Sequence, residues 1–543
     1  MGRFARLPAI PILGIIVSTG GTAYPLPAAA QSSTQTASPN VHEVLAEGVA
    51  AMHRGDAPTA RRLFRHVLAV DPKNVTARTY LGVLADGAGD LADAERQFAV
   101  AAAVAPSSPE ARNNYGAALL KEGKTDQAAK EFEASLRLNP EQAGALSNLA
   151  QIRFESGDLR TAQSLFEKAA ALVSDVQVAH ALVVISLRLH EPAEAARKYS
   201  EYSALLGRVS QNIVTPAGRT ELGAALLEQG LAKEASQELL AAVEVEPASA
   251  NEVVLLARAY RGQKEFSQAE QTIKSALARG LETAPLFAEL AETEDAAGHV
   301  EDAIPAMRRA IQLEPTSEAY RFRYAMLLTD ANAPQAAVIR LKEALDEFPK
   351  SSKLWFAMGL AQSKDNKKEA AIEAFEQCIA LDPQISSAYA YMGIIEVDLG
   401  KIQEAVAFYR KALASDEHSA VTHYLISRAL ERLTPPDDAG TERHLRRALE
   451  LDSGFQQAHV ALGKLFLRTN HFEGAARELE GVIRADPKLG EAYYQLGRVY
   501  MRLKRKEEAQ AMMAKFEQLS DAEKEQSESE RREIVRRLVN VRF

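Results

Sequence analysis

The 543-residue chain is poor in several kinds of residue, and each shortage excludes something. Cys378 is the only cysteine, so no disulfide can form within the chain. Aromatic residues make up 6% of the sequence, with a single tryptophan, which suits helices packed through alanine and leucine. Positive charge is not in excess, because the net charge is -9, and this balance argues against a nucleic-acid-binding protein.

Catalytic and metal-binding motifs are also missing. The 11 histidines are scattered, and His418 and His423 lie five residues apart with no cysteine nearby. No H-E-x-x-H, G-x-S-x-G, Walker A or protein-kinase motif occurs. Carboxylates are frequent, but in this pattern they are typical of solvated helix surfaces. The sequence therefore gives no reason to expect an enzyme, a metal site or a cofactor.

Proline returns at an interval of 34 residues. It stands at Pro72, Pro106 and Pro140 and again, with the same spacing, at Pro315, Pro349 and Pro383. The same residue types recur before each of these prolines. The repeat that ends at Pro140 contains Tyr115, Gly116, Ala128 and Phe132. A period of this length indicates a solenoid, in which each repeat buries its apolar face against its neighbours.

This pattern resembles the tetratricopeptide repeat, a unit of two helices with small residues where the helices cross and a closing proline. The resemblance implies an all-α fold, a right-handed α-solenoid of about fourteen two-helix repeats. We expect the repeats to begin near Val41, Val75, Pro109, Ala143, Gln177, Pro216, Ala250, Ala284, Glu318, Ser352, Ser386, Ala420, Gln456 and Gly490.

Glycine occupies one position in seven of these repeats, at Gly82, Gly116, Gly223, Gly359, Gly393, Gly463 and Gly497. Glycine inside a helix costs roughly 1 kcal/mol relative to alanine, so its recurrence needs a physical reason. None of these glycines lies in a phosphate-binding G-x-G-x-x-G motif. We therefore predict that they allow two helices to approach closely.

Two irregularities suggest divisions of the chain. Five additional residues at 211–215 follow the fifth repeat, and we predict a hinge there between an N-terminal array (41–210) and a C-terminal array (216–523). The end of the chain, 524–543, is highly charged but carries Ile534, Val535, Leu538 and Val539 at helical spacing. That pattern predicts a helix that caps the solenoid.

The first 30 residues have the layout of a secretory signal peptide. Arg3 and Arg6 precede an apolar stretch from Leu7 to Val17, and small residues end at Ala30. We predict cleavage after Ala30 and a secreted or periplasmic chain without a stable membrane span, whose net charge would change from -9 to -11 because residues 1–30 contain no acid. Residues 31–40 are expected to form a disordered polar leader. An uncleaved membrane anchor remains the alternative.

Basic residues recur at two positions of the last three repeats. One series is Arg428, Lys464 and Arg498, and the other, four residues later, is Arg432, Arg468 and Arg502. In the family that the repeats resemble, the first helix of each repeat faces the concave surface, so the six side chains are expected to form one continuous basic face. Such a face would attract an acidic peptide or an acidic polysaccharide. A merely solvated surface is the alternative.

Asparagine occurs at equivalent positions of the third and fourth repeats, at Asn114 and Asn148. Some peptide-binding members of the family hold a ligand backbone with asparagines on the inner helices, and two amides here could donate and accept in the same way.

These observations favour a non-enzymatic scaffold that binds a protein or peptide partner, for example an acidic one, through its concave surface. The alternative is an assembly or export factor of the cell envelope that holds an acidic polysaccharide in a basic C-terminal groove.

Overall fold

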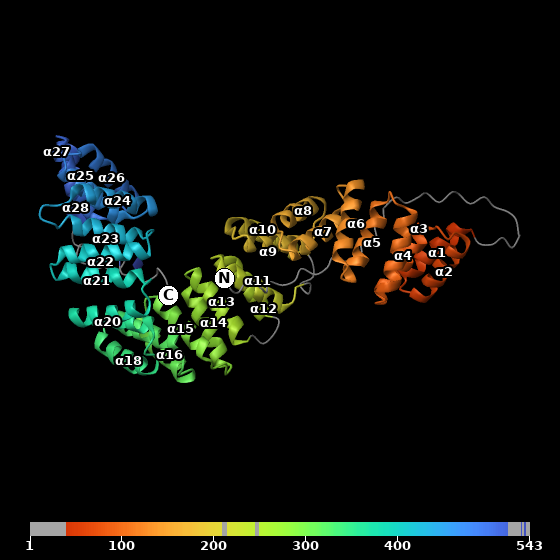
Figure 1. Cartoon of the computed structure of the whole chain (residues 1–543), viewed down its shortest axis with the longest axis horizontal. Helices are drawn as coiled ribbons and strands as arrows, with labels where there is room; N and C mark the ends of the chain where they lie inside the picture. Colours follow the sequence, from red (N-terminus) through yellow and green to blue (C-terminus); the bar gives the residue numbers. More distant parts are fainter. Residues whose placement is uncertain (1–39, 209–213, 245–248, 520–533, 535–536, 539–543) are drawn as a thin grey trace. The chain divides into compact units, whose positions relative to one another are not determined.

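The computed structural model describes residues 40–208, 214–244 and 249–519, together with Ile534, Arg537 and Leu538. Helices α1 to α28 follow one another through these residues, and the described parts contain no strand (Figure 1). Consecutive helices pack in pairs, one pair to each repeat, and within each of the two compact bodies described below each pair also contacts the next. The all-α solenoid of fourteen two-helix repeats is confirmed.

The first helices of the repeats begin where the sequence predicts, with a difference of a single residue at α9. They are Val41–His53 (α1), Val75–Gly87 (α3), Pro109–Lys121 (α5), Ala143–Glu155 (α7), Val176–Arg188 (α9), Pro216–Glu228 (α11), Ala250–Gly262 (α13), Ala284–Ala296 (α15), Glu318–Asp330 (α17), Ser352–Lys364 (α19), Ser386–Asp398 (α21), Ala420–Leu430 (α23), Gln456–Arg468 (α25) and Gly490–Arg502 (α27).

The second helices alternate with these along the chain. They are Ala57–Val70 (α2), Leu91–Val104 (α4), Thr125–Leu138 (α6), Leu159–Leu172 (α8), Pro192–Leu206 (α10), Ala232–Val243 (α12), Phe266–Ala278 (α14), Val300–Leu313 (α16), Pro334–Glu347 (α18), Lys368–Leu381 (α20), Ile402–Ser415 (α22), Asp438–Leu451 (α24), Phe472–Ala485 (α26) and Lys506–Leu519 (α28).

Local chemistry explains where these helices start and stop. Many helices begin at a residue whose side chain accepts a hydrogen bond from the first turn, as Ser108 does from the backbone N–H of Ala111. Within a repeat, the turn requires a left-handed residue, and Gly123 supplies it with φ 75°. Helix α6 ends at Leu138, immediately before Asn139 and the repeat-closing Pro140.

The recurring glycines lie where the two helices of a repeat cross. A Cβ atom added at Gly116 would lie 2.8 Å from Cε1 of Phe132, and one added at Gly359 would lie 2.6 Å from Cε1 of Phe375. Both rings are completely buried. The prediction that these glycines permit close helix approach is confirmed.

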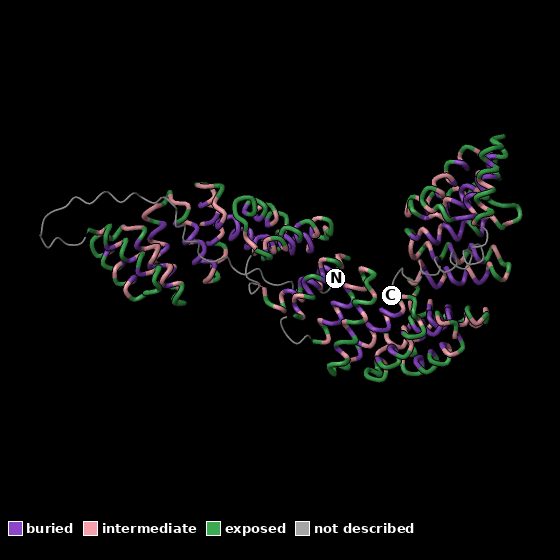
Figure 2. Tube along the Cα trace, turned by 180° about the vertical axis from the view of Figure 1, so that it is seen from behind, coloured by how far each residue is buried: buried purple, intermediate pink, exposed green. Residues whose placement is uncertain are grey.

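The chain divides into two compact bodies, which we describe separately. The N-terminal body (Met1–Leu281) contains α1 to α14, and the C-terminal body (Glu282–Phe543) contains α15 to α28. In both, buried residues lie on the sides of the helices that face other helices of the same body, and exposed residues gather at the turns (Figure 2). The division follows a complete repeat, so each body is built from seven helix pairs.

Residues 211–213 of the predicted hinge at 211–215 lie outside the described residues, and Thr215 caps the start of α11. Helices on the two sides of this segment share buried contacts. Glu238 of α12 accepts a hydrogen bond from the Tyr199 hydroxyl of α10 at 2.9 Å and pairs with Arg219 of α11 at 3.0 Å. Burial raises the pKa of the Glu238 carboxyl. Bending at this segment stays a prediction.

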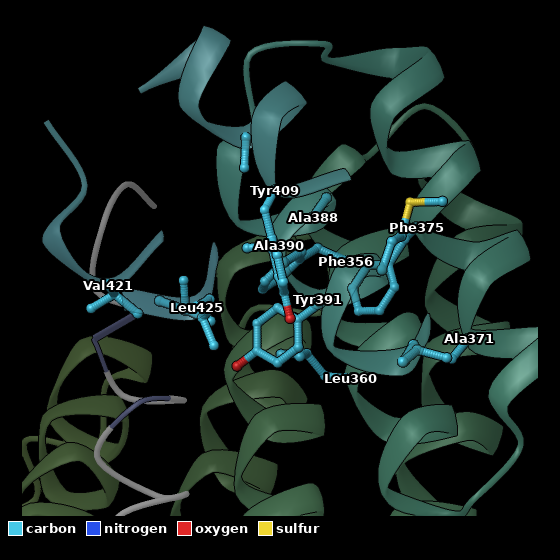
Figure 3. Close-up of a cluster of buried hydrophobic side chains, with 14 of the residues drawn as sticks. Phe356, Leu360, Ala371, Phe375, Ala388, Ala390, Tyr391, Tyr409, Val421 and Leu425 are labelled. Carbon is cyan, nitrogen blue, oxygen red and sulfur yellow. The ribbon is translucent and has the colours of Figure 1, made fainter. Parts of the chain in front are cut away.

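Aromatic residues lie in the middle of the large apolar cluster of the C-terminal body (Figure 3). The rings of Phe375 and Tyr391 stack with centroids 5.7 Å apart, and Phe356 meets Tyr391 edge-on at 5.8 Å. Figure 3 shows Val421 and Leu425 on one side of these rings and Ala371 on the other. Cys378 belongs to the same cluster, and burial raises the pKa of its thiol to about 12, so it is a packing residue.

The predicted signal peptide and nearly all of the leader, residues 1–39, lie outside the described residues. Most of 524–543 does so as well, but Ile534, Arg537 and Leu538 are described and are helical. Leu538 is 3% exposed and belongs to the apolar cluster of the C-terminal body. A cap over the last repeat stays a prediction.

Candidate functional site

The two sets of residues that the sequence singles out lie in different bodies. Asn114 and Asn148 belong to the N-terminal body, on α5 and α7, and the six basic residues belong to the C-terminal body, on or directly after α23, α25 and α27. All of them therefore lie on first helices or at their C-terminal ends. Within a body, some neighbouring first helices contact one another, as α5 does α3 and α7. In each body, we call the surface that the first helices form its first-helix face.

Helices α5 and α7 bring together a cluster of buried amides. Asn114 and Asn148 are 3% and 1% exposed, and each is preceded by another buried polar residue, Asn113 or Ser147. The Nδ2 atom of Asn148 donates to Oδ1 of Asn113 at 3.4 Å, which links the two helices. One turn further along α7, Gln151 donates to Glu155 at 2.6 Å. The structure thus links α5 and α7 through Asn113 and Asn148, and Asn114 is the buried residue next to Asn113.

The carbonyl oxygen of Asn114 is not satisfied. The Oδ1 atom of Asn114 is buried and accepts no hydrogen bond from any described residue. A buried polar group without a partner costs about 1–3 kcal/mol of stability, so such atoms are rare in folded proteins. The N-terminal body therefore holds a buried carbonyl oxygen that has no hydrogen-bond partner among the described residues.

Sequence reasoning missed three members of the cluster, Asn113, Ser147 and Gln151. A usable signal was present for two of them, since Asn113-Asn114 and Ser147-Asn148 are polar pairs at equivalent positions of consecutive repeats. An adjacent pair in a helix points about 100° apart, so both members are buried only where the helix is covered on more than one side. On α7 this coverage extends to nearly every residue.

The basic residues of the C-terminal body do not form a continuous positive face, because acidic residues lie among them. Glu431 pairs with Arg428 at 2.5 Å and with Arg468 at 3.2 Å. Arg468 also pairs with Asp438 at 2.6 Å. The expectation of an uninterrupted basic surface overlooked these carboxylates, which lie outside the two series in the sequence.

The remaining basic residues vary in their partners. Lys464 pairs with Glu491 at 2.5 Å, and Arg498 donates to Gln495 at 2.9 Å and lies over the Tyr494 ring. Arg432 and Arg502 are exposed and form no ion pair with a described residue. These two side chains keep the most charge available to a ligand, and a ligand role for the six residues stays a prediction.

Family models identify the repeats directly. One model described as "Tetratricopeptide repeat" matches residues 51–114 and 119–184, and a second with the same description matches 288–352, 356–420 and 460–517. Together these segments cover more than half of the chain. The molecule is an all-α repeat protein, and it belongs to the tetratricopeptide repeat family.

Several solved structures are similar in fold. The yeast Tom70 structure is 18% identical, with a TM-score of 0.40, 76% of this chain covered and 92% of that chain. A human IFIT1 dimer with PPP-AAAA is 18% identical, with a TM-score of 0.37 and coverages of 71% and 92%. YrrB, described as a TPR protein with an unusual peptide-binding site, is 22% identical over 33% of this chain and 91% of its own, with a TM-score of 0.30.

Because these TM-scores are below 0.5, the family assignment rests on the family models and on the helices themselves. A search of curated proteins gave no match. Within the described residues, every helix is too short or too polar to cross a membrane.

Proposed function

We propose that the chain is a non-enzymatic scaffold that binds protein partners through its first-helix face, and that the amides of α5 and α7 hold the backbone of an extended peptide. A peptide backbone presents alternating N–H donors and C=O acceptors. Asparagine offers both in one side chain, so two asparagines on neighbouring helices can bracket a peptide unit. Backbone recognition of this kind suits a scaffold that accepts partners of differing sequence.

The observation that carries the proposal is the unsatisfied Oδ1 atom of Asn114. The hydrogen bond that joins α5 and α7 runs from Nδ2 of Asn148 to Oδ1 of Asn113 at 3.4 Å and does not involve Asn114. A ligand N–H that reaches Asn114 would regain the free energy that the buried oxygen loses in the free protein. Packing alone would be better served by an apolar residue at this position.

The signal-like segment before Gln31 supports a location in the cell envelope or outside the cell. The mass of the chain recovered from the exported fraction tests this, because cleavage after Ala30 gives a mature protein that starts at Gln31. A mature species that retains Leu7–Val17 would indicate a membrane anchor.

An acidic polysaccharide has less support as the ligand. Three of the six basic side chains, Arg428, Lys464 and Arg468, already pair with carboxylates of the same body. Binding a polyanion would require these pairs to open, or would rely on Arg432 and Arg502.

Replacement of both amides by leucine separates binding from stability. Short peptides selected from a random displayed library against the full chain serve as the probe. Leucine has the branched shape of asparagine with slightly bulkier ends, and at Asn114 it removes a buried acceptor without a partner. We therefore expect Asn114→Leu to change the melting temperature little, and Asn114→Leu with Asn148→Leu to abolish binding of the selected peptides.

Ser164→Leu is the control, because it adds the same apolar group at an exposed position on the second helix α8. This variant should bind like wild type. Unchanged peptide affinity in the double leucine variant would remove the amide cluster from the binding site.

A further inference from the structure

The C-terminal segment forms specific contacts with a loop 85 residues back along the chain. Arg537 pairs with Oδ2 of Asp452 at 2.5 Å, and its guanidinium lies over the ring of Phe455 with 4.6 Å between Cζ and the ring centroid. Both partners belong to the loop between α24 and α25, at Asp452 and Phe455. The contact therefore lies two repeats before the end of the array rather than on its last pair of helices.

Apolar burial accompanies this ion pair. Leu538 is 3% exposed and is part of the same apolar cluster as Leu425 and Phe455, and Ile534 packs against that cluster. Phe455 itself is completely buried and its ring lies 5.0 Å from that of Tyr424 on the first helix α23. Ile534 and Leu538 are four residues apart, so they lie on the same side of a helix.

The loop that receives Arg537 has an equivalent in the next repeat. Asp452 and Asp486 occupy the same position of consecutive repeats, and each accepts a hydrogen bond at 2.9 Å from the backbone N–H two residues later, that of Gly454 or Lys488. This hydrogen bond uses Oδ1 of each aspartate. At Asp452 the second oxygen, Oδ2, accepts a hydrogen bond from Arg537. The same side chain therefore closes the loop through Oδ1 and binds the C-terminal segment through Oδ2.

We propose that the surface around Asp452 and Phe455 is a peptide-docking site, and that its resident ligand is the C-terminal segment of the same chain, through Ile534, Arg537 and Leu538. The site selects a short helical segment with an apolar residue at one position and an Arg-Leu pair three and four residues later. Asp452 recognises the arginine, Phe455 supports its guanidinium, and the apolar cluster accepts the leucine. A partner that carries this pattern must displace the C-terminal segment.

This inference concerns the C-terminal body and does not depend on the amide site of the N-terminal body. The two can fail separately, because the probes differ and the substituted residues lie in different bodies. Here the probe is a fluorescent peptide with the sequence of residues 529–543, added to the full-length protein.

An added peptide can bind only to sites that the resident segment leaves free. Its apparent affinity is therefore the intrinsic affinity multiplied by the fraction of sites that are free. Substitution of the resident anchors, Arg537→Glu with Leu538→Asp, should therefore increase the affinity for the peptide by roughly tenfold or more over wild type. Adding Asp452→Arg to that variant should remove the gain. Asp486→Arg is the matched control, since it disturbs the equivalent loop and should preserve the gain.

Three results would overturn the proposal. One is equal peptide affinity in wild type and in the Arg537→Glu, Leu538→Asp variant. Another is equal loss of affinity on Asp452→Arg and Asp486→Arg, which would indicate general damage to the loops. The third is a wild-type dimer that becomes monomeric on Leu538→Asp in sedimentation velocity, which would place the segment on a second copy instead of its own chain.

Discussion

Some single residues of this protein allow its helices to pack closely, whereas others bury a polar atom that packing does not explain. Gly359 and Asn114 represent the two kinds. At Gly359 the absence of a side chain admits the Phe375 ring, and at Asn114 a polar atom is buried without a partner. The first is explained by stability, whereas the second opposes stability and is the basis of the peptide site proposed above.

The packing role of glycine gives a prediction with an internal control. Gly359→Ala would place a Cβ atom 2.6 Å from the Phe375 ring, and we expect overpacking to cost about 1–3 kcal/mol. Gly481, inside α26, has no atom within 4 Å of an added Cβ. Gly481→Ala should instead stabilise its helix by about 0.5–1 kcal/mol.

Hydrogen exchange measured helix by helix checks both substitutions, because a repeat array does not unfold as a single unit. Protection should fall in α19 and α20 for Gly359→Ala and rise in α26 for Gly481→Ala. Changes of the same sign in the two variants would contradict the packing account.

The sequence predicted packing residues far better than it predicted site residues. Gly116 and Phe132 have equivalents in other repeats because the two helices of each repeat cross in the same way. The periodicity of the sequence therefore reveals them. Asn113 and Gln151 do not recur through the array, and their burial depends on neighbouring helices. Carboxylates such as Glu431 were missed because an ion pair is set by distance in space, whereas the basic series was read from sequence position alone.

At the scale of helices, each pair is fixed by contacts within and between repeats. The helix starts follow from the repeat period, since that period sets the positions of the turns. Tertiary links between pairs are not periodic and could not be predicted. The connection of α10, α11 and α12 through Tyr199, Arg219 and Glu238 is the clearest case.

Removal of one member of that link should be costly. Arg219 and Glu238 have side chains 9% and 2% exposed, so Arg219→Met leaves a buried carboxylate without its cation and should cost about 3–5 kcal/mol. The double variant Arg219→Met, Glu238→Leu should recover much of this loss, because no buried charge remains.

Arg197→Ala provides the comparison within the same body. Arg197 pairs with Glu201 at 2.7 Å in a position where both side chains are about half exposed, and such pairs contribute about 0–1 kcal/mol. Protection of α10 and α12 against hydrogen exchange measures all three variants. A double variant as damaged as Arg219→Met alone would show that the site requires the ion pair itself.

At the scale of the whole molecule, the repeat fold was predictable from the sequence, but the boundary between the two bodies and the contact of the C-terminal segment were not. The period identified fourteen helix pairs, and the insertion suggested two arrays divided at 211–215. The two compact bodies of the described residues, with seven pairs each, divide instead between Leu281 and Glu282. Nor did the period place Arg537 against Asp452, because that contact joins a residue outside the repeats to a loop of the array. Each body carries its own candidate site, with amides in one and a resident C-terminal segment in the other.

The central claim is that partners bind the first-helix face of the N-terminal body. Photo-cross-linking tests it most directly, with a selected peptide that carries a photoreactive side chain and with mass spectrometry of the adducts on the full-length protein. The account predicts adducts on α5 and α7, and their loss in the Asn114→Leu, Asn148→Leu variant. Adducts confined to the second helices α6 and α8, or to the C-terminal body, would contradict it.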